Sequence, residues 1–144
     1  MSISPRRART VIDAALLERL ESLAGAAIVR FPEVAYPLVD KLTAAKLVNR
    51  SRLPPDVVTI GSDVLYRDQH SARNLRVTLS WPEQADISLG RISILTPVGV
   101  ALLGLAAGDR FQWTTRAGVE RGLTVLHVAP PGVSVPVDHN LQTA

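Results

Sequence analysis

The first regular pattern along the chain is helical. From Asp13 to Gly25, apolar side chains recur every three or four positions and charged ones fall on the opposite face; the apolar members are Leu16, Leu17, Leu20 and Leu23. Asp13 is the expected N-cap, because its carboxylate can accept the free N–H groups of a first helical turn. Gly25 is the natural stop. The segment 13–25 is therefore predicted to be a helix.

A second helical pattern follows the first. Its apolar residues face one side and its charged residues the other: Val34, Leu38, Leu42 and Ala45 against Asp40, Lys41 and Lys46. Pro37 lacks an N–H and disrupts a helix that is already under way. The helix therefore begins near Tyr36 or is kinked at Pro37, and we favour the later start. Two short helices in succession predict a helical hairpin.

Beyond the hairpin the pattern becomes strand-like. The tract Asn49 to Pro55 ends in two prolines, which favour extended backbone and predict a domain boundary. After it, short segments alternate apolar and polar residues between turn signals. The predicted strands are Val57 to Ile60, Asp63 to Arg67, Leu75 to Trp81, Arg91 to Leu95, Arg110 to Thr115 and Glu120 to Val128.

One short helix interrupts the strands. Thr96 and Pro97 are typical of a helix start, and the apolar residues after them carry the helix to Leu103. Ala117 and Gly118 form a turn signal that joins the last two strands as an antiparallel hairpin. The prediction is an α+β fold: a short N-terminal antiparallel helical hairpin, then a twisted antiparallel sheet of about five strands with one short helix packed on it.

The predicted organisation has four parts. Residues 1–12 are a flexible basic lead-in, 13–50 the helical hairpin, 51–130 the sheet domain and 131–144 a flexible tail. With 144 residues, 47% of them hydrophobic and 20% charged, the chain is in the range of folded globular domains. No apolar run is long enough to span a bilayer, and MSISPRRART at the start has no apolar segment behind its arginines. A cytoplasmic location is expected.

The net charge of +3 is unevenly distributed. Residues 1–53 hold nine Lys and Arg against five Asp and Glu, whereas the remainder holds seven against eight. Arg6, Arg7 and Arg9 supply much of the excess. Such a basic segment is either a solvated arm or a contact for nucleic acid or an acidic protein.

Residues that could carry catalysis are scattered. The histidines, His70, His127 and His139, lack metal-ligand spacing, and the chain has no cysteine. No phosphate-binding glycine motif is present. We therefore predict no catalytic residue, no metal site and no cofactor, and interpret the chain as a binding module rather than an enzyme. Phe111 and Trp113, beside Arg110, come nearest to a base-stacking surface, but packing in the sheet is the favoured interpretation.

Three blocks of sequence resemble one family. They are PPDVVTIGSDVLYRD (Pro54 to Asp68), ADISLGRISILTPVGVALLGLAAGDRFQW (Ala85 to Trp113) and LTVLHV (Leu123 to Val128). Together they are similar to the regulator of nucleoside diphosphate kinase family, short-armed relatives of the Gre transcript-cleavage factors, whose members bind RNA polymerase. The resemblance implies an FKBP-like sheet domain that docks on a coiled coil at the rim of the polymerase secondary channel. It also implies that the helical hairpin is a truncated Gre-like coiled coil that points into the channel.

The resemblance places the docking loop at Leu95, Thr96 and Pro97. Cleavage factors carry an Asp-Ser-Pro type of sequence there. This chain keeps the proline and a hydroxyl residue but has Leu95 in place of the aspartate.

The predicted hairpin tip differs from that of the cleavage factors. It contains Ile28, Val29, Arg30 and Phe31, and no Asp or Glu occurs in residues 25–32. The acidic tips of cleavage factors help to hold a catalytic Mg²⁺. This chain is therefore expected to occupy the polymerase without stimulating transcript cleavage. For the apolar tip residues, contact with a partner and packing within the loop both stay open.

The leading hypothesis is a monomeric transcription regulator that binds RNA polymerase and affects nucleoside diphosphate kinase indirectly, through transcription. Two alternatives stay open. One is a peptidyl-prolyl isomerase, suggested by fold resemblance alone. The other is a nucleic-acid-binding module that contacts DNA or RNA through Arg6, Arg7 and Arg9.

Overall fold

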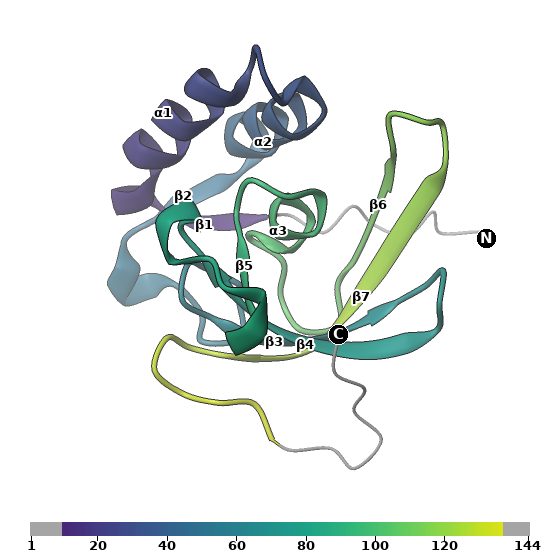
Figure 1. The fold of residues 1–144 in the computed structure, drawn as a ribbon. Coiled ribbons are helices and arrows are strands. Elements are labelled where there is room, and N and C mark those ends of the chain that lie inside the picture. Colours follow the sequence, from purple (N-terminus) through teal and green to yellow (C-terminus); the bar gives the residue numbers. More distant parts are fainter. Residues whose placement is uncertain (1–9, 137–144) are drawn as a thin grey trace, which may run out of the picture.

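The computed structural model describes residues 10–136, and these form an α+β fold (Figure 1). Two helices, α1 (Leu17–Ala27) and α2 (Pro32–Ala44), lie together on one side of the molecule. A curled sheet lies on the other side, and the short helix α3 (Pro97–Leu102) lies between the helices and the sheet. The predicted α+β class is confirmed.

The main sheet has the strand order β5-β4-β3-β7-β6. Its strands are β3 (Asp63–Asp68), β4 (Arg73–Ser80), β5 (Arg91–Ser93), β6 (Arg110–Thr114) and β7 (Glu120–Ala129). Neighbouring strands are antiparallel except β4 and β5, which run parallel. The prediction of an antiparallel sheet is wrong at this pair. Between the two strands the chain passes through two 3-10 turns, Pro82–Gln84 and Ile87–Leu89, and so enters β5 in the same direction as β4.

The segment predicted as the first strand of the sheet does not join it. Val57 forms only an isolated bridge with Ala106. The Val58 N–H donates to the Leu105 carbonyl at 2.8 Å, and the Val58 carbonyl accepts the Gly104 N–H at 2.9 Å. Residues 57–60 therefore follow the chain that leaves α3. The other predicted strands are present, with small shifts at their ends.

Asp13 caps the first helical segment as predicted. Its carboxylate accepts the Ala15 N–H at 2.9 Å, at the start of a 3-10 turn (Ala14–Leu16) that continues into α1. The predicted stop at Gly25 is wrong, because α1 ends at Ala27. Gly25 does not adopt the positive φ of a C-capping glycine, so the helix runs through it.

The second helix begins earlier than predicted. α2 starts at Pro32, not near Tyr36, and Pro37 lies inside it. Pro37 is exposed, so water can reach the carbonyl that its missing N–H leaves without a partner. The prediction that Lys41 faces away from the core is also wrong, because its side chain is buried.

A second, two-stranded sheet ties down the start of the described chain. β1 (Val11–Asp13) pairs in parallel with β2 (Lys46–Val48). The Val11 N–H donates to the Gly104 carbonyl at 3.1 Å, and Ile12 is buried. A flexible lead-in is therefore wrong for Val11 and Ile12. The arginines at positions 6, 7 and 9 lie outside the described residues.

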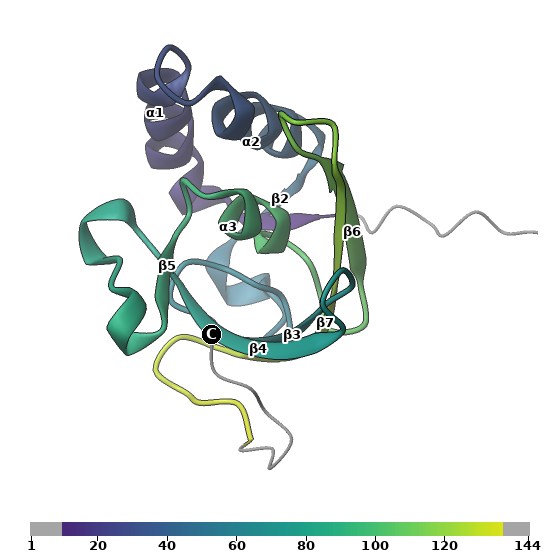
Figure 2. The ribbon, with the colours of Figure 1, turned by 45° about the vertical axis from the view of Figure 1, so that its right-hand side comes forward.

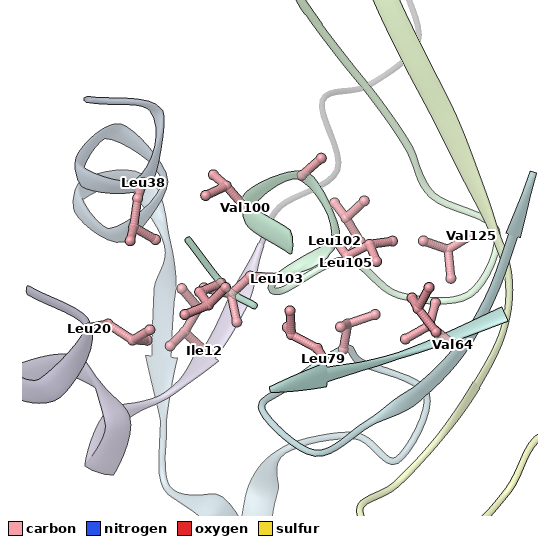
Figure 3. Packing of buried hydrophobic residues seen from close by; sticks show 14 of the residues in the cluster. Ile12, Leu20, Leu38, Val64, Leu79, Val100, Leu102, Leu103, Leu105 and Val125 are labelled. Carbon is pink, nitrogen blue, oxygen red and sulfur yellow. The ribbon is translucent and has the colours of Figure 1, made fainter. Parts of the chain in front are cut away.

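One hydrophobic core joins the helices to the sheet (Figure 3). Side chains of α1 and α2 meet those of α3 and of the sheet in one cluster, which includes Leu20, Leu38, Val100, Leu103, Leu79, Val64 and Val125. This cluster crosses the boundary predicted at Asn49 to Pro55. The helices therefore bury apolar surface against the rest of the molecule as well as against each other.

The chain after β7 packs on the outer face of the sheet. Val135 is 3% exposed and packs with Leu65 and Ala129. The predicted loose tail is therefore wrong at Val135, while residues 137–144 lie outside the described part. Among the helices of residues 10–136, none has the length and apolarity required to cross a bilayer.

Candidate interaction site

Residues 94–97, which we call the β5–α3 loop, are anchored on both sides. The Ile94 N–H donates to the Ser80 carbonyl at 2.9 Å, and the Ile94 side chain is fully buried. The Leu95 N–H donates to Ser93 Oγ at 2.9 Å. Leu95 is half-buried and Pro97 is exposed. Strands β4 and β5 thus hold the backbone of the loop in place, and the ring of Pro97 is exposed at its end.

Thr96 is the N-cap of α3. Its backbone is extended (φ −132°, ψ 156°), and its Oγ1 accepts the Gly99 N–H at 3.1 Å. The same hydroxyl donates to the Ser93 carbonyl at 2.7 Å. Pro97 follows at the start of the helix, where no N–H is required. The helix start predicted from Thr96 and Pro97 is confirmed.

Gly99 allows the loop to approach the helix closely. A Cβ at this position would lie 2.3 Å from the Ser93 carbonyl oxygen and 2.9 Å from Thr96 Oγ1. Both distances are far below van der Waals contact. A residue with a side chain at position 99 would therefore displace the loop or the helix.

The other end of α3 is bound by a lysine from α2. Lys41 Nζ donates to the Ala101 and Leu103 carbonyls, each at 2.8 Å, and lies 4.2 Å from the centre of the Phe111 ring. Burial lowers the pKa of Lys41 to about 7. Carbonyls at a helix C-terminus lack intrahelical donors, and the lysine supplies them.

The predicted hairpin tip is the turn between α1 and α2. Ile28 is half-buried, whereas Arg30 is exposed, Val29 is 86% exposed and Phe31 is 50% exposed. The Phe31 N–H donates to the Ala27 carbonyl at 2.7 Å, so the turn is closed by backbone bonding. Three of the four tip side chains are thus exposed, and Ile28 is partly buried.

The turn between β6 and β7 reaches the first turn of α2 (Figure 2). Arg116 Nη1 lies 3.9 Å from Glu33 Oε2, and the Arg116 side chain is 82% exposed. Such an exposed pair contributes little stability. It does place Glu33, the acidic residue that follows the tip in the chain, beside a guanidinium.

A third contact joins α1 to the sheet region. Arg19 lies over the Trp81 ring, 3.9 Å from its centre, and pairs with Glu83. A guanidinium over an indole face is a favourable cation–π arrangement. Together with Lys41 and the Glu33–Arg116 pair, it connects both helices to the body of the molecule through polar side chains as well as apolar ones.

The structure does not gather all the predicted site residues in one place. The β5–α3 loop and the hairpin tip are separate in both views of the molecule (Figures 1 and 2). The sequence analysis missed Lys41, because a lysine on an amphipathic pattern is ordinarily assigned to the polar face. Lys41 comes three residues after Leu38 and therefore lies on the apolar stripe of the helix. This position was the signal in the sequence that its side chain is buried.

Phe111 and Trp113 are partly buried against the core, with ring centres 6.3 Å apart. Lys41 lies against the Phe111 ring. The favoured interpretation, packing in the sheet, is confirmed for these two side chains.

Metal-binding residues do not converge in the part of the chain that the structure describes. Among residues 10–136, no group of three or more His, Asp or Glu is placed to hold a metal ion. His70 is exposed in the β3–β4 turn, and His127 is exposed on β7. His139 lies outside the described residues.

The sequence matches one family model. Residues 53–130 match "Transcription elongation factor, GreA/GreB, C-term". A regulator of nucleoside diphosphate kinase from Escherichia coli (strain K12) is 35% identical over 96 residues, which cover 64% of this chain and 71% of that protein. A transcription elongation factor GreA from Pelobacter propionicus is 36% identical over 83 residues, which cover 58% of this chain and 52% of that GreA.

The fold also matches a solved structure. A prokaryotic transcription elongation factor GreA/GreB from Nitrosomonas europaea superposes with a TM-score of 0.66 at 36% sequence identity. The superposition covers 84% of this chain and 99% of that one. It therefore includes helices as well as the sheet.

Proposed function

The chain belongs to the GreA/GreB family of transcription elongation factors through residues 53–130, and from this membership we propose that it is a transcription regulator that binds RNA polymerase. The relatives are named as regulators and elongation factors, and the chain is proposed to have no catalytic residues of its own. In this proposal it works in the cytoplasm, as a monomer, on the enzyme that transcribes the genome.

The β5–α3 loop is the proposed contact with the polymerase. Leu95, Thr96 and Pro97 are the positions that the resemblance assigns to docking at the rim of the secondary channel. The observation that carries this proposal is the preorganised loop, in which Thr96 is bonded on both sides and Pro97 is exposed. A rigid loop loses little conformational entropy on binding, which favours affinity. Leu95 replaces a charge, so the proposed contact is apolar where that of the cleavage factors is acidic.

The tip is proposed to act without stimulating transcript cleavage. Its exposed side chains are Val29, Arg30 and Phe31, and the neighbouring Glu33 lies beside Arg116. Holding Mg²⁺ requires several oxygen ligands at short range. A single carboxylate close to a guanidinium is a poor substitute for an acidic tip.

The division into a hairpin (13–50) and an FKBP-like sheet domain (51–130) is kept as part of this proposal, with the hairpin as a truncated Gre-like coiled coil. The proposed effect on nucleoside diphosphate kinase is indirect, through transcription. The E. coli relative is named for that regulation and is 35% identical to this chain over 96 residues, and residues 53–130 of this chain match a transcription elongation factor family.

The test is a binding assay between the purified full chain and bacterial core RNA polymerase. Pro97→Ala is expected to weaken binding about tenfold, because it removes an exposed anchor at the centre of the proposed contact. Pro55→Ala is the matched control, since Pro55 is exposed on the segment before β3. Equal loss in both variants, or no binding of the unaltered chain at micromolar concentration, would refute the docking proposal.

A second assay measures cleavage of the transcript in backtracked complexes. The unaltered chain is expected to leave the cleavage rate at the level of polymerase alone, while a GreA protein in the same assay raises it. Acceleration by this chain would contradict the proposed role of the tip.

A further inference from the structure

Lys41 connects three elements through its terminal amino group. It lies on α2, is 6% exposed, and donates to two carbonyls at the end of α3, those of Ala101 and Leu103. Its Nζ also lies against the Phe111 ring of β6. No other described residue joins the helical hairpin to α3 by a side-chain hydrogen bond.

Burying this amino group lowers the stability of the fold. A buried ammonium loses its hydration, and an apolar side chain of the same length would avoid that loss. Among residues 10–136 the ion pairs do not include Lys41, so no carboxylate compensates the charge. Its compensation comes from two carbonyls and an aromatic face. A lysine in such a place calls for an explanation beyond packing.

The two ends of α3 suggest that explanation. The N-terminal end is the β5–α3 loop, where Thr96 caps the helix. The C-terminal end is the one that Lys41 holds. α3 has six residues and is therefore about 9 Å long, so a displacement at one end reaches the other with little loss. Val100 and Leu102 are buried, so α3 is packed in the core along its length.

We propose that Lys41 is a positioning residue, through which the helical hairpin sets the β5–α3 loop for its partner. The hairpin then has a role beyond its tip: α2 fixes the orientation of α3, and α3 fixes the exposed Pro97. This inference rests on the proposed function for the identity of the partner. The coupling itself is a property of the chain alone.

The coupling is tested first on the isolated full chain by amide hydrogen exchange. Lys41→Met keeps the length of the side chain and removes its donors. The informative amides are those of Gly99 and Val100, which donate to Thr96 Oγ1 and to the Thr96 carbonyl. They are expected to exchange at least about tenfold faster in Lys41→Met, whereas the Gly61 N–H, bonded to the Leu79 carbonyl in the sheet region, keeps its rate.

Lys46→Met is the matched control, because Lys46 is exposed on β2. A uniform change at all slowly exchanging amides would mean that Lys41 acts only on global stability, and it would overturn the proposal. Unchanged exchange at Gly99 and Val100 would do the same. If Lys41→Met does not fold, Lys41→Gln, which keeps an N–H donor, takes its place and is expected to give an intermediate effect at the same two amides.

The second arm is the polymerase binding assay with Lys41→Met and Pro97→Ala side by side. Lys41 is buried and cannot touch a partner, so weaker binding by about tenfold would come through the loop. If Pro97→Ala weakens binding and Lys41→Met does not, the positioning role is wrong while the docking proposal stands. If the unaltered chain does not bind polymerase, the docking proposal is wrong, and the exchange experiment alone decides the coupling.

Discussion

Thr96 Oγ1 accepts the Gly99 N–H at 3.1 Å, and this bond closes the loop on the first turn of α3. The same oxygen carries the proton that is donated to the Ser93 carbonyl. One hydroxyl therefore fixes both the end of β5 and the start of α3. The exposed Pro97 follows directly in the chain, so its position depends on this pair of residues.

Replacement of Thr96 by alanine is expected to lower the free energy of unfolding by about 1 kcal/mol, the usual effect of losing an N-cap side chain. Thr96→Ser keeps the hydroxyl and should retain most of that stability. Urea denaturation of the three proteins gives the comparison. Equal midpoints for Thr96→Ala and the unaltered chain would show that the cap is not a source of stability.

Two glycine-to-alanine changes should alter the free energy of unfolding in opposite directions. Gly99→Ala forces a Cβ into the Ser93 carbonyl and Thr96 Oγ1 and is expected to cost about 1–3 kcal/mol of unfolding free energy. Gly25 lies in α1, and a Cβ there would meet no other atom within 4 Å. Gly25→Ala should therefore stabilise the helix, by about 0.5–1 kcal/mol. Thermal unfolding measures both, and a stabilising Gly99→Ala would contradict the close approach of loop and helix.

Local signals explain why much of the loop could be predicted from the sequence. Thr96 followed by Pro97 has one common structural meaning, a capped helix start, and the neighbouring residues do not oppose it. The same holds for Ala117 and Gly118, whose turn joins two strands in direct succession. In such cases the residues that decide the structure are adjacent in the chain.

The features that the sequence analysis missed depend on contacts between distant segments. The residues near Lys41 in the chain do not indicate its hydrogen-bond acceptors. These are two carbonyls at the end of α3, about sixty positions further along. The strand at Val11 likewise needs a partner at Lys46. Val135 follows two prolines in a segment without periodicity, and its burial depends on Asp63, Leu65 and Ala129, which are distant or earlier in the chain.

The buried lysine should make stability depend on pH. Its pKa falls from 10.5 in the unfolded chain to about 7 in the folded protein, so the unfolded state binds the proton more tightly between these values. Unfolding is therefore favoured by protonation, and the free energy of unfolding should rise as the pH rises from about 7 towards 10.5. At 1.36 kcal/mol per pKa unit, the upper limit of this rise is about 5 kcal/mol.

The measurement compares the unaltered chain with Lys41→Met by urea denaturation at several pH values across this interval. Other groups titrate equally in both proteins, so the difference between the two curves isolates Lys41. As the pH rises, the free energy of unfolding of the unaltered chain should increase relative to that of Lys41→Met. Parallel curves would mean that the buried amine has an ordinary pKa.

Asp63 holds the end of the described chain to the sheet. Its carboxylate receives Arg76 through three bonds of 2.7–3.2 Å, and its Oδ2 also accepts the Val135 N–H at 2.8 Å. Asp63→Ala leaves the guanidinium and this buried N–H without their acceptor. Because Arg76 is still partly exposed, we expect a loss of about 2–3 kcal/mol, somewhat below that for a fully buried pair.

Glu83→Ala provides the comparison for Asp63→Ala, because Glu83 pairs with Arg19 at the surface, where an ion pair contributes little stability. The two variants remove the same kind of charge from environments that differ in burial. Amide exchange at Val135 adds a local measurement, since Asp63→Ala should expose that N–H and Glu83→Ala should not. Similar losses of stability in both variants, with Val135 still protected, would show that the bonds to Asp63 do not anchor residues 131–136.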